Sequence, residues 1–198
     1  MKKQVEAVIP TKWGAFNMIA YAEDLENPMP HLALVHPEVD TSMPVYLRIH
    51  SECLTGDLFG SGRCDCGEQL DNAMQMVAEK RGVVLYLRQE GRGIGLINKL
   101  KAYNLQDEGL NTADANVHLG LEVDARQYGI AVEIMNSLGI KSIHLLTNNP
   151  LKIEAIEKSS VKVESRVPIV IKPNRENRAY LKTKEELMGH LFKSNGKG

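Results

Sequence analysis

The three cysteines of this chain, Cys53, Cys64 and Cys66, all lie in one short segment. One thiol is left over if any two of them form a disulfide, and a secreted disulfide scaffold would look different. Thiolates are the soft ligands that zinc prefers, so the cluster predicts a metal site in a reducing compartment. The chain must therefore fold so that this segment closes around one ion.

The spacing of the cysteines favours a metal with an open coordination position. Cys64 and Cys66 can reach one ion from a tight turn, while Cys53 arrives from the preceding segment. Three protein ligands leave the fourth tetrahedral position of zinc to a water, whose pKa falls to about 7 on the metal. Such a water can attack an electron-poor ring carbon, as in the zinc-dependent cytidine and adenine deaminases.

A structural zinc site, completed by His36, His50 or another histidine, is the alternative interpretation. A metal with four protein ligands would be inert. On an extended strand, His50 would point away from the face that carries Cys53, so joint ligation by these two residues is awkward. The open, catalytic site is therefore the favoured interpretation.

Length and charge limit the class of protein. The chain has 198 residues, enough for one domain with a substantial core. Its formal net charge of -1 argues against a general polyanion binder, so any phosphate site must be local. The sequence contains no uninterrupted apolar span able to cross a bilayer, and we expect a cytoplasmic location.

Apolar periodicity and turn residues predict a single α+β domain, with a mixed or antiparallel sheet and flanking helices. Residues 1–50 predict short antiparallel strands. Beyond them we expect helices at 70–78, 94–104, 125–138, 150–159 and 183–191, strands at 83–87, 142–146 and beyond 161, and a polar loop at 172–178. The domain would cover residues 1–192, followed by a mobile polar tail at 193–198.

A glycine-rich turn, RQEGRGIG at 88–95, leaves a predicted strand and enters a predicted helix. Such a turn can present backbone amides to phosphate. Its glycines match a dinucleotide-binding fingerprint only loosely, and the chain lacks the rest of that unit. Two arginines and a glutamate suit a polyphosphate with its magnesium better, although a solvated charged loop is an equal alternative.

Two predicted helix starts allow both a structural and a functional interpretation. Asp124 and Gln127 form a capping pair, which by itself explains Asp124 and leaves Arg126 as an ordinary surface residue. Likewise, TNNPLK at 147–152 can be a strand exit followed by an N-cap and a first-turn proline. The same segment also places a hydroxyl, amides and Lys152 at a helix N-terminus, where an anion is favoured.

Taken in order, these motifs resemble those of the GTP cyclohydrolase II family. The matching segments are RIHSECLTGD (48–57), RCDCG (63–67), RQEGR (88–92), LQD (105–107), LTNNP (146–150) and MGHL (188–191). The resemblance covers nearly the whole chain. It implies an enzyme that opens the imidazole ring of GTP and releases formate and pyrophosphate at the head of riboflavin synthesis. It also implies a homodimer, and we expect the stand-alone form of the enzyme.

The resemblance implies ligands for the metal and for the nucleotide. Zinc would be held by Cys53, Cys64 and Cys66, with a water attacking the imidazole carbon of guanine. Magnesium would be bound at the triphosphate with help from the carboxylates, and Gln69 has the donor and acceptor needed to read a guanine edge. The residues that would hold GTP are Arg48, Ile49, His50, Ser51, Glu52, Gln69, Glu90, Gly91, Arg92, Thr112, Thr147 and Lys152.

The resemblance also implies three catalytic residues. Arg126 would attack the α-phosphate and expel pyrophosphate, with Asp124 as proton acceptor, and Tyr103 would orient or protonate the opened ring. A guanidinium is almost always protonated and is a poor nucleophile. Arg126 could instead stabilise the charge of the transferring phosphoryl group.

Two rival functions stay open at this point. A zinc nucleotide deaminase would release ammonia, but its usual Pro-Cys-x-x-Cys signature is replaced here by Cys-x-Cys. A zinc-stapled module would bind nucleotide without turnover and would carry a fourth protein ligand on its metal.

Overall fold

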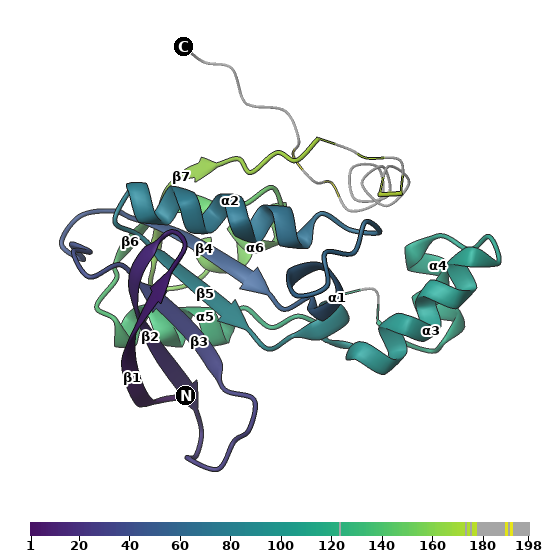
Figure 1. Ribbon diagram of the computed structural model, residues 1–198, viewed down its shortest axis with the longest axis horizontal. Helices are drawn as coiled ribbons and strands as arrows, with labels where there is room; N and C mark the ends of the chain where they lie inside the picture. Colours follow the sequence, from purple (N-terminus) through teal and green to yellow (C-terminus); the bar gives the residue numbers. More distant parts are fainter. Residues whose placement is uncertain (123, 173, 175, 178–188, 190, 192–198) are drawn as a thin grey trace.

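A seven-stranded sheet in the order β1-β2-β3-β5-β4-β6-β7 forms the centre of the molecule (Figure 1). The computed structural model describes residues 1–122, 124–172, 174, 176–177, 189 and 191. The tail expected at 193–198 lies outside the described residues, as does the helix expected at 183–191 except for positions 189 and 191. The loop expected at 172–178 is described only in part.

The sheet is mixed, as the sequence predicts. β1, β2, β3 and β5 pair antiparallel in that order, whereas β5, β4, β6 and β7 run parallel. The prediction of antiparallel strands over residues 1–50 is therefore wrong for β4, which pairs parallel with both β5 and β6 because connections that contain helices return the chain to the same end of the sheet. The strands are β1 (Lys2–Thr11), β2 (Gly14–Ala22), β3 (His31–Val35), β4 (Val45–Ser51), β5 (Val83–Leu87), β6 (Ser142–Leu146) and β7 (Lys162–Val167).

Helices cover the parallel half of the sheet on both faces (Figure 1). On one face, α2 packs through Ala73 and Met74; on the other, α5 and α6 pack through Ile134 and Ile156. Burial on both faces explains why β5 reads VVLYL, a continuous apolar run. No described helix is both long and apolar enough to cross a membrane. The covering helices are α2 (Cys66–Glu79), α5 (Gly129–Ser137) and α6 (Pro150–Glu157).

The remaining helices gather beyond the carboxyl ends of the parallel strands. α1 (Leu54–Asp57) follows β4, and the short 3₁₀ helix η1 (Glu90–Gly93) follows β5. α3 (Leu96–Asp107) and α4 (Thr112–His118) form a pair set apart from the sheet, on the right in Figure 1. The sequence did not predict α1 or α4, both of which are short helices.

The crossovers explain why a site forms at this edge. The connection from β4 leads through α2 to β5, whereas β6 leads through α6 to β7 on the other side of β4. The chain therefore leaves β4 and β6 in opposite directions and opens a crevice between their carboxyl ends. In parallel sheets, ligands bind in such a crevice.

The expected helix start at Asp124 is wrong. α5 begins at Gly129, and its N-cap residue, Tyr128, makes no side-chain capping bond. The Ala125 amide donates to the Arg92 carbonyl at 3.0 Å, and the Gln89 side chain donates to the Gln127 carbonyl at 2.7 Å. These tertiary hydrogen bonds hold residues 124–127 against the η1 turn and outside the helix. They outweigh the local capping preference of Asp124.

The start of α6 agrees with the sequence. Asn149 is the N-cap, its side chain accepts a hydrogen bond from the Leu151 amide, and Pro150 occupies the first turn. The sequence could predict this helix start because the N-cap and its hydrogen-bond partner lie only two residues apart.

Candidate active site

The three cysteine side chains meet between α1 and α2. All three Sγ atoms lie within 4.8 Å of one another, and Cys53 and Cys64 are buried. Cys53 is the N-cap of α1, while Cys66 is the first residue of α2. The two helices can approach because Gly67 has no side chain: a Cβ there would lie 2.3 Å from the Gly56 carbonyl oxygen.

This donor set fits a soft divalent metal such as zinc. Three sulfur atoms in one cluster match a tetrahedral site with one open position. Within the described residues, no histidine or carboxylate joins the three thiols at that distance. A fourth ligand from His36 or His50 is therefore not supported, and the open-site interpretation agrees with the geometry.

The thiols of the cluster do not titrate alike. Hydrogen bonds from Cys64 and Cys66 hold the pKa of Cys53 far below its ordinary value, and the Lys99 ammonium lowers it further. The hydrogen bond with Cys53 raises the pKa of Cys64. The Lys99 ammonium lies 3.1 Å from Cys53 Sγ, and its positive charge favours the thiolate form of Cys53, which is the form that binds metal.

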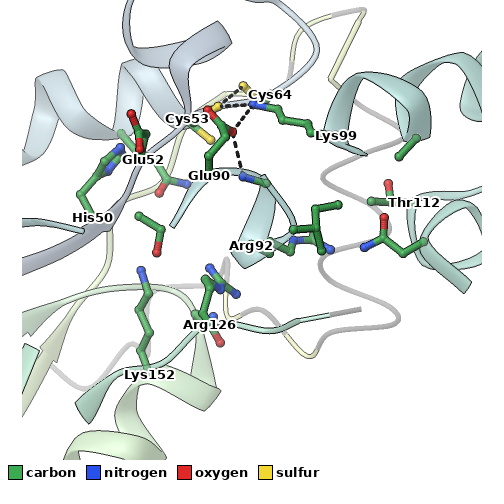
Figure 2. A pocket seen from close by; sticks show the side chains of 18 of the residues that line it. His50, Glu52, Cys53, Cys64, Glu90, Arg92, Lys99, Thr112, Arg126 and Lys152 are labelled. Carbon is green, nitrogen blue, oxygen red and sulfur yellow. Dashed lines mark hydrogen bonds and ion pairs between the residues drawn. The ribbon is translucent and has the colours of Figure 1, made fainter. Parts of the chain in front are cut away.

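A pocket opens beside the cluster and encloses about 1020 Å³, including space open to solvent. Figure 2 shows Cys53, Cys64 and Lys99 at one end, Arg126 and Lys152 at the opposite end, and Thr112 on the α4 side. The sequence-predicted residues that line it are Arg48, His50, Ser51, Glu52, Cys53, Cys64, Cys66, Gln69, Glu90, Gly91, Arg92, Tyr103, Thr112, Arg126, Thr147 and Lys152. The fold thus brings together residues from eight separate motifs or single positions chosen from the sequence.

Two of the predicted residues, Ile49 and Asp124, do not line the pocket. The Ile49 side chain is fully buried in the core, but its carbonyl oxygen accepts a hydrogen bond from Lys152 Nζ at 2.7 Å. Asp124 binds Arg126 instead, accepting from Nε at 2.7 Å and also from Nη2. Ile49 and Asp124 therefore affect the pocket indirectly, by binding Lys152 and Arg126, which do line it.

Asp124 is held as a carboxylate by its partner. Burial raises its pKa, but hydrogen bonds and charge from Arg126 outweigh burial and keep the pKa below the ordinary value. The fork of two bonds orients the guanidinium. Asp124 therefore fixes Arg126 and does not cap α5.

Four buried polar atoms of the pocket-lining residues have no hydrogen-bond partner within the described part of the chain. They are Arg48 Nε, His50 Nδ1, Ser51 Oγ and Asn149 Nδ2. Buried polar groups are nearly always paired in folded proteins. Their gathering in one pocket indicates a ligand with several donors and acceptors.

His50 is oriented by a carboxylate behind it. Its Nε2 lies 3.0 Å from both oxygens of Asp57, which also accepts hydrogen bonds from Tyr86 Oη at 2.9 Å and from the Cys53 amide. Burial lowers the pKa of His50 and so favours the neutral ring. With Nε2 protonated toward Asp57, Nδ1 remains as the acceptor.

Arg48 and Gln69 form a second oriented pair. Arg48 Nη2 donates to Gln69 Oε1 at 2.6 Å, and the Gln69 amide donates to Asp65. These bonds fix the orientation of the Gln69 amide while leaving one hydrogen and one lone pair of that amide without a partner in these contacts. The predicted role in reading a guanine edge is compatible with this geometry.

The glycine-rich turn has an unusual backbone. Gly91 and Arg92 both adopt the left-handed conformation, with φ of 61° and 62°. A non-glycine residue in this region is strained, and such residues concentrate at functional sites. The turn therefore holds Arg92 in a left-handed backbone conformation that a non-glycine residue rarely adopts.

The sequence did not predict that Lys99 and Asn116 line the pocket. Asn148 and Asn149 also line it and lie in the predicted TNNPLK segment, although neither was named as a site residue. Lys99 is the most notable because its side chain is buried against Cys53 and Glu90. Burial lowers the pKa of Lys99, but the hydrogen bond to Glu90 and the charge of Cys53 raise it above the ordinary value. The local sequence of α3 gave no signal of this contact, because its apolar residues Ile97 and Leu100 are exposed while Lys99 is buried.

Residues 2–168 match the sequence profile of the family described as GTP cyclohydrolase II. The chain belongs to the GTP cyclohydrolase II family. The riboflavin biosynthesis protein RibBA of Chlorobium phaeovibrioides is 49% identical over 193 residues, covering 97% of this chain and 47% of that protein. RibBA of Bacillus cytotoxicus is 50% identical over 191 residues, covering 96% and 48%.

The chain of this GTP cyclohydrolase II family member thus spans about half the length of the curated relatives it matches. Among solved structures, a two-domain 3,4-dihydroxy-2-butanone 4-phosphate synthase from A. baumannii, RibBX, overlaps 84% of this chain and 40% of its own. Its TM-score of 0.49 and 20% identity are too low to support an argument. Family membership therefore rests on the sequence profile and on the RibBA relatives.

Replacement of Gly67 by alanine tests the close approach of α1 and α2. The new Cβ would meet the Gly56 carbonyl, so Cys66 would move away from Cys53. We expect Gly67→Ala to lower the free energy of unfolding by about 1–3 kcal/mol and to lower the amount of metal that the cysteine cluster binds. Urea denaturation and metal analysis measure the two effects.

Gly129→Ala is the matched control, because nothing lies within 4 Å of a Cβ at the first residue of α5. Its stability should stay the same or rise by up to about 1 kcal/mol. Full stability and full metal content in Gly67→Ala would contradict the argument.

Proposed function

We propose that this chain is a GTP cyclohydrolase II, which opens the imidazole ring of GTP and releases formate and pyrophosphate. One observation carries the proposal: a single pocket is lined by both a three-thiol cluster and buried cations. The thiols suit hydrolysis at an electron-poor carbon, and the cations suit a triphosphate. Membership of the GTP cyclohydrolase II family and the names of the RibBA relatives support this activity and a role in riboflavin biosynthesis.

Zinc is the proposed resident metal, with Cys53, Cys64 and Cys66 as its ligands. When bound, it would supply a Lewis acid and an activated water at the cysteine end of the pocket. The chain itself holds the three sulfur atoms together and offers His50 Nδ1 and Ser51 Oγ to the polar edge of the base. Because both of these atoms are buried, they would bind the substrate without competition from bulk water.

The triphosphate would be bound by Arg92, Arg126 and Lys152, with Thr112 and Thr147 as further donors. Magnesium would enter with the triphosphate, because its ligands in nucleotide sites are mainly phosphate oxygens and water. Glu52 and Glu90 would contribute little to it directly. Glu52 already binds Arg88 at 2.7 Å, and Glu90 binds Lys99 at 2.8 Å.

Arg126 is proposed to act at the α-phosphate. Its paired bonds to Asp124 keep the guanidinium protonated, which favours stabilisation of phosphoryl charge over nucleophilic attack. Asp124 would then position Arg126. Tyr103, which lines the α3 side of the pocket, would orient or protonate the opened ring.

The assembly and location are part of the same proposal. We propose a single domain over residues 1–192, which the continuous sheet from β1 to β7 supports for residues 2–167. The family resemblance supports a homodimer, and a cytoplasmic location is proposed with it.

The direct test is incubation of the purified protein with GTP and magnesium, with formate and pyrophosphate followed separately. We expect both products from the zinc-loaded protein and loss of formate after treatment with a zinc chelator. Ammonia in place of formate would indicate a deaminase. Binding of GTP without any product would indicate a nucleotide-binding module.

Cys53→Ser separates the metal step from the phosphate step. We expect formate release to be abolished while some pyrophosphate release survives, because the phosphate-binding cations are unchanged. Metal analysis and circular dichroism control for loss of zinc and for loss of fold. Equal survival of both products would contradict the catalytic role of the metal.

Arg126→Ala removes the cation proposed to act at the α-phosphate. We expect pyrophosphate formation to fall by about a hundredfold to a thousandfold, as when a preorganised donor to a transition-state charge is removed. Arg81→Ala is the control, since Arg81 forms an exposed pair with Glu38 and does not line the pocket. Unchanged turnover in Arg126→Ala would remove Arg126 from the mechanism.

A further inference from the structure

Lys99 is a buried cation between the cysteine cluster and the glycine-rich turn. It comes from α3, and only 8% of the residue is exposed. Its Nζ donates hydrogen bonds to Cys53 Sγ at 3.1 Å and to Glu90 Oε1 at 2.8 Å (Figure 2). It also donates to Thr55 Oγ1 at 2.9 Å. All three donor hydrogens of the ammonium can therefore be used inside the protein.

Glu90 completes a link between two segments that are far apart in sequence. Its Oε1 accepts hydrogen bonds from its own neighbour, the Gly91 amide, at 2.8 Å as well as from Lys99. Its Oε2 accepts from the Leu54 amide at 2.6 Å, directly after Cys53. One carboxylate thus joins the η1 turn to the start of α1.

The charges in this region explain why a cation is needed there. Three thiolates on a divalent metal carry one net negative charge, and the Glu90 carboxylate adds another nearby. Two like charges in a buried site repel strongly because the local dielectric constant is low. The Lys99 ammonium lies in contact with both groups and offsets that repulsion.

We propose that Lys99 is a positioning residue that holds the Cys53 thiolate and the Glu90 carboxylate together, and so couples the metal cluster to the phosphate-binding turn. The inference rests on the proposed metal site. It assigns Glu90 to the link with Lys99 and Leu54, where its carboxylate accepts three hydrogen bonds, including one from the Gly91 amide. Hydrogen-bonding partners outside the ligand set commonly change metal affinity in this way.

The test is zinc affinity, measured by competition with a chromophoric chelator, for wild type, Lys99→Met, Glu90→Gln and the double variant. Lys99→Met leaves two negative groups facing each other, and we expect its zinc affinity to fall about 10–100-fold. Glu90→Gln removes one negative charge and keeps Lys99, so its affinity should be unchanged or higher. The double variant should bind zinc more tightly than Lys99→Met, because the repulsion is gone.

The double variant separates a charge effect from simple damage to the fold. If Lys99 served only to pack α3, the double variant would bind zinc more weakly than Lys99→Met, because it also loses the hydrogen bonds of Glu90. An affinity of the double variant equal to or below that of Lys99→Met would overturn the proposal. In the cobalt-substituted protein, Lys99→Met should also shift the thiolate-to-metal charge-transfer band, because Cys53 loses a hydrogen-bond donor.

The chain offers a matched control in the exposed pair of Lys158 and Glu154, whose side chains lie 2.6 Å apart on α6 and its C-cap. Lys158→Met, Glu154→Gln and their combination should leave zinc affinity unchanged.

The outcomes distinguish this inference from the proposed function. Wild-type protein that binds no zinc would overturn both. Wild-type protein that binds zinc tightly, with Lys99→Met binding it equally well, would overturn only the role of Lys99.

Discussion

Parallel pairing of β4 with β5 on one side and β6 on the other is the constraint on which the rest of the structure depends. It brings the carboxyl ends of three strands to one edge, and each strand delivers a different part of the pocket there. β4 leads into the cysteine segment, β5 into the glycine-rich turn, and β6 into the cap of α6. Because helices cover both faces of these strands, the pairing register is held by burial and not only by hydrogen bonds.

The pocket gathers more buried charge than a core would tolerate without compensation. Arg48, Lys99 and Lys152 are each at most 8% exposed. Arg48 donates to the Leu146 carbonyl, Lys152 to the Ile49 carbonyl, and Lys99 to Glu90 and Cys53. Buried charges are tolerated only when they are paired or hydrogen-bonded. Two of these cations donate to backbone carbonyls of neighbouring strands, and Lys99 links two side chains from different segments. The same bonds that stabilise the cations therefore align the strand ends and turns that carry them.

Several features were predictable because they depend on residues close together in sequence. The strand from Val83, the glycine-rich turn after it and the Asn149 cap follow from local propensity and turn chemistry. The cap assigned to Asp124 failed because hydrogen bonds from Ala125 to Arg92 and from Gln89 to Gln127 hold that segment against the η1 turn. The burial of Lys99 could not be predicted, since a lysine is ordinarily exposed and nothing in the pattern of α3 marks this position.

The sequence by itself determined the chemical inventory: three thiols able to share one ion, a turn able to present amides, and cations in motifs that resemble one family. Only the tertiary structure decided which of these groups meet. Arg48 reaches the Leu146 carbonyl across 98 residues of sequence, and Lys99 reaches Cys53 across 46. Contacts between residues so far apart in sequence depend on the order of the strands and on which carboxylates are already paired. A local sequence pattern contains no information on either, because both are set by the packing of the whole sheet and its covering helices.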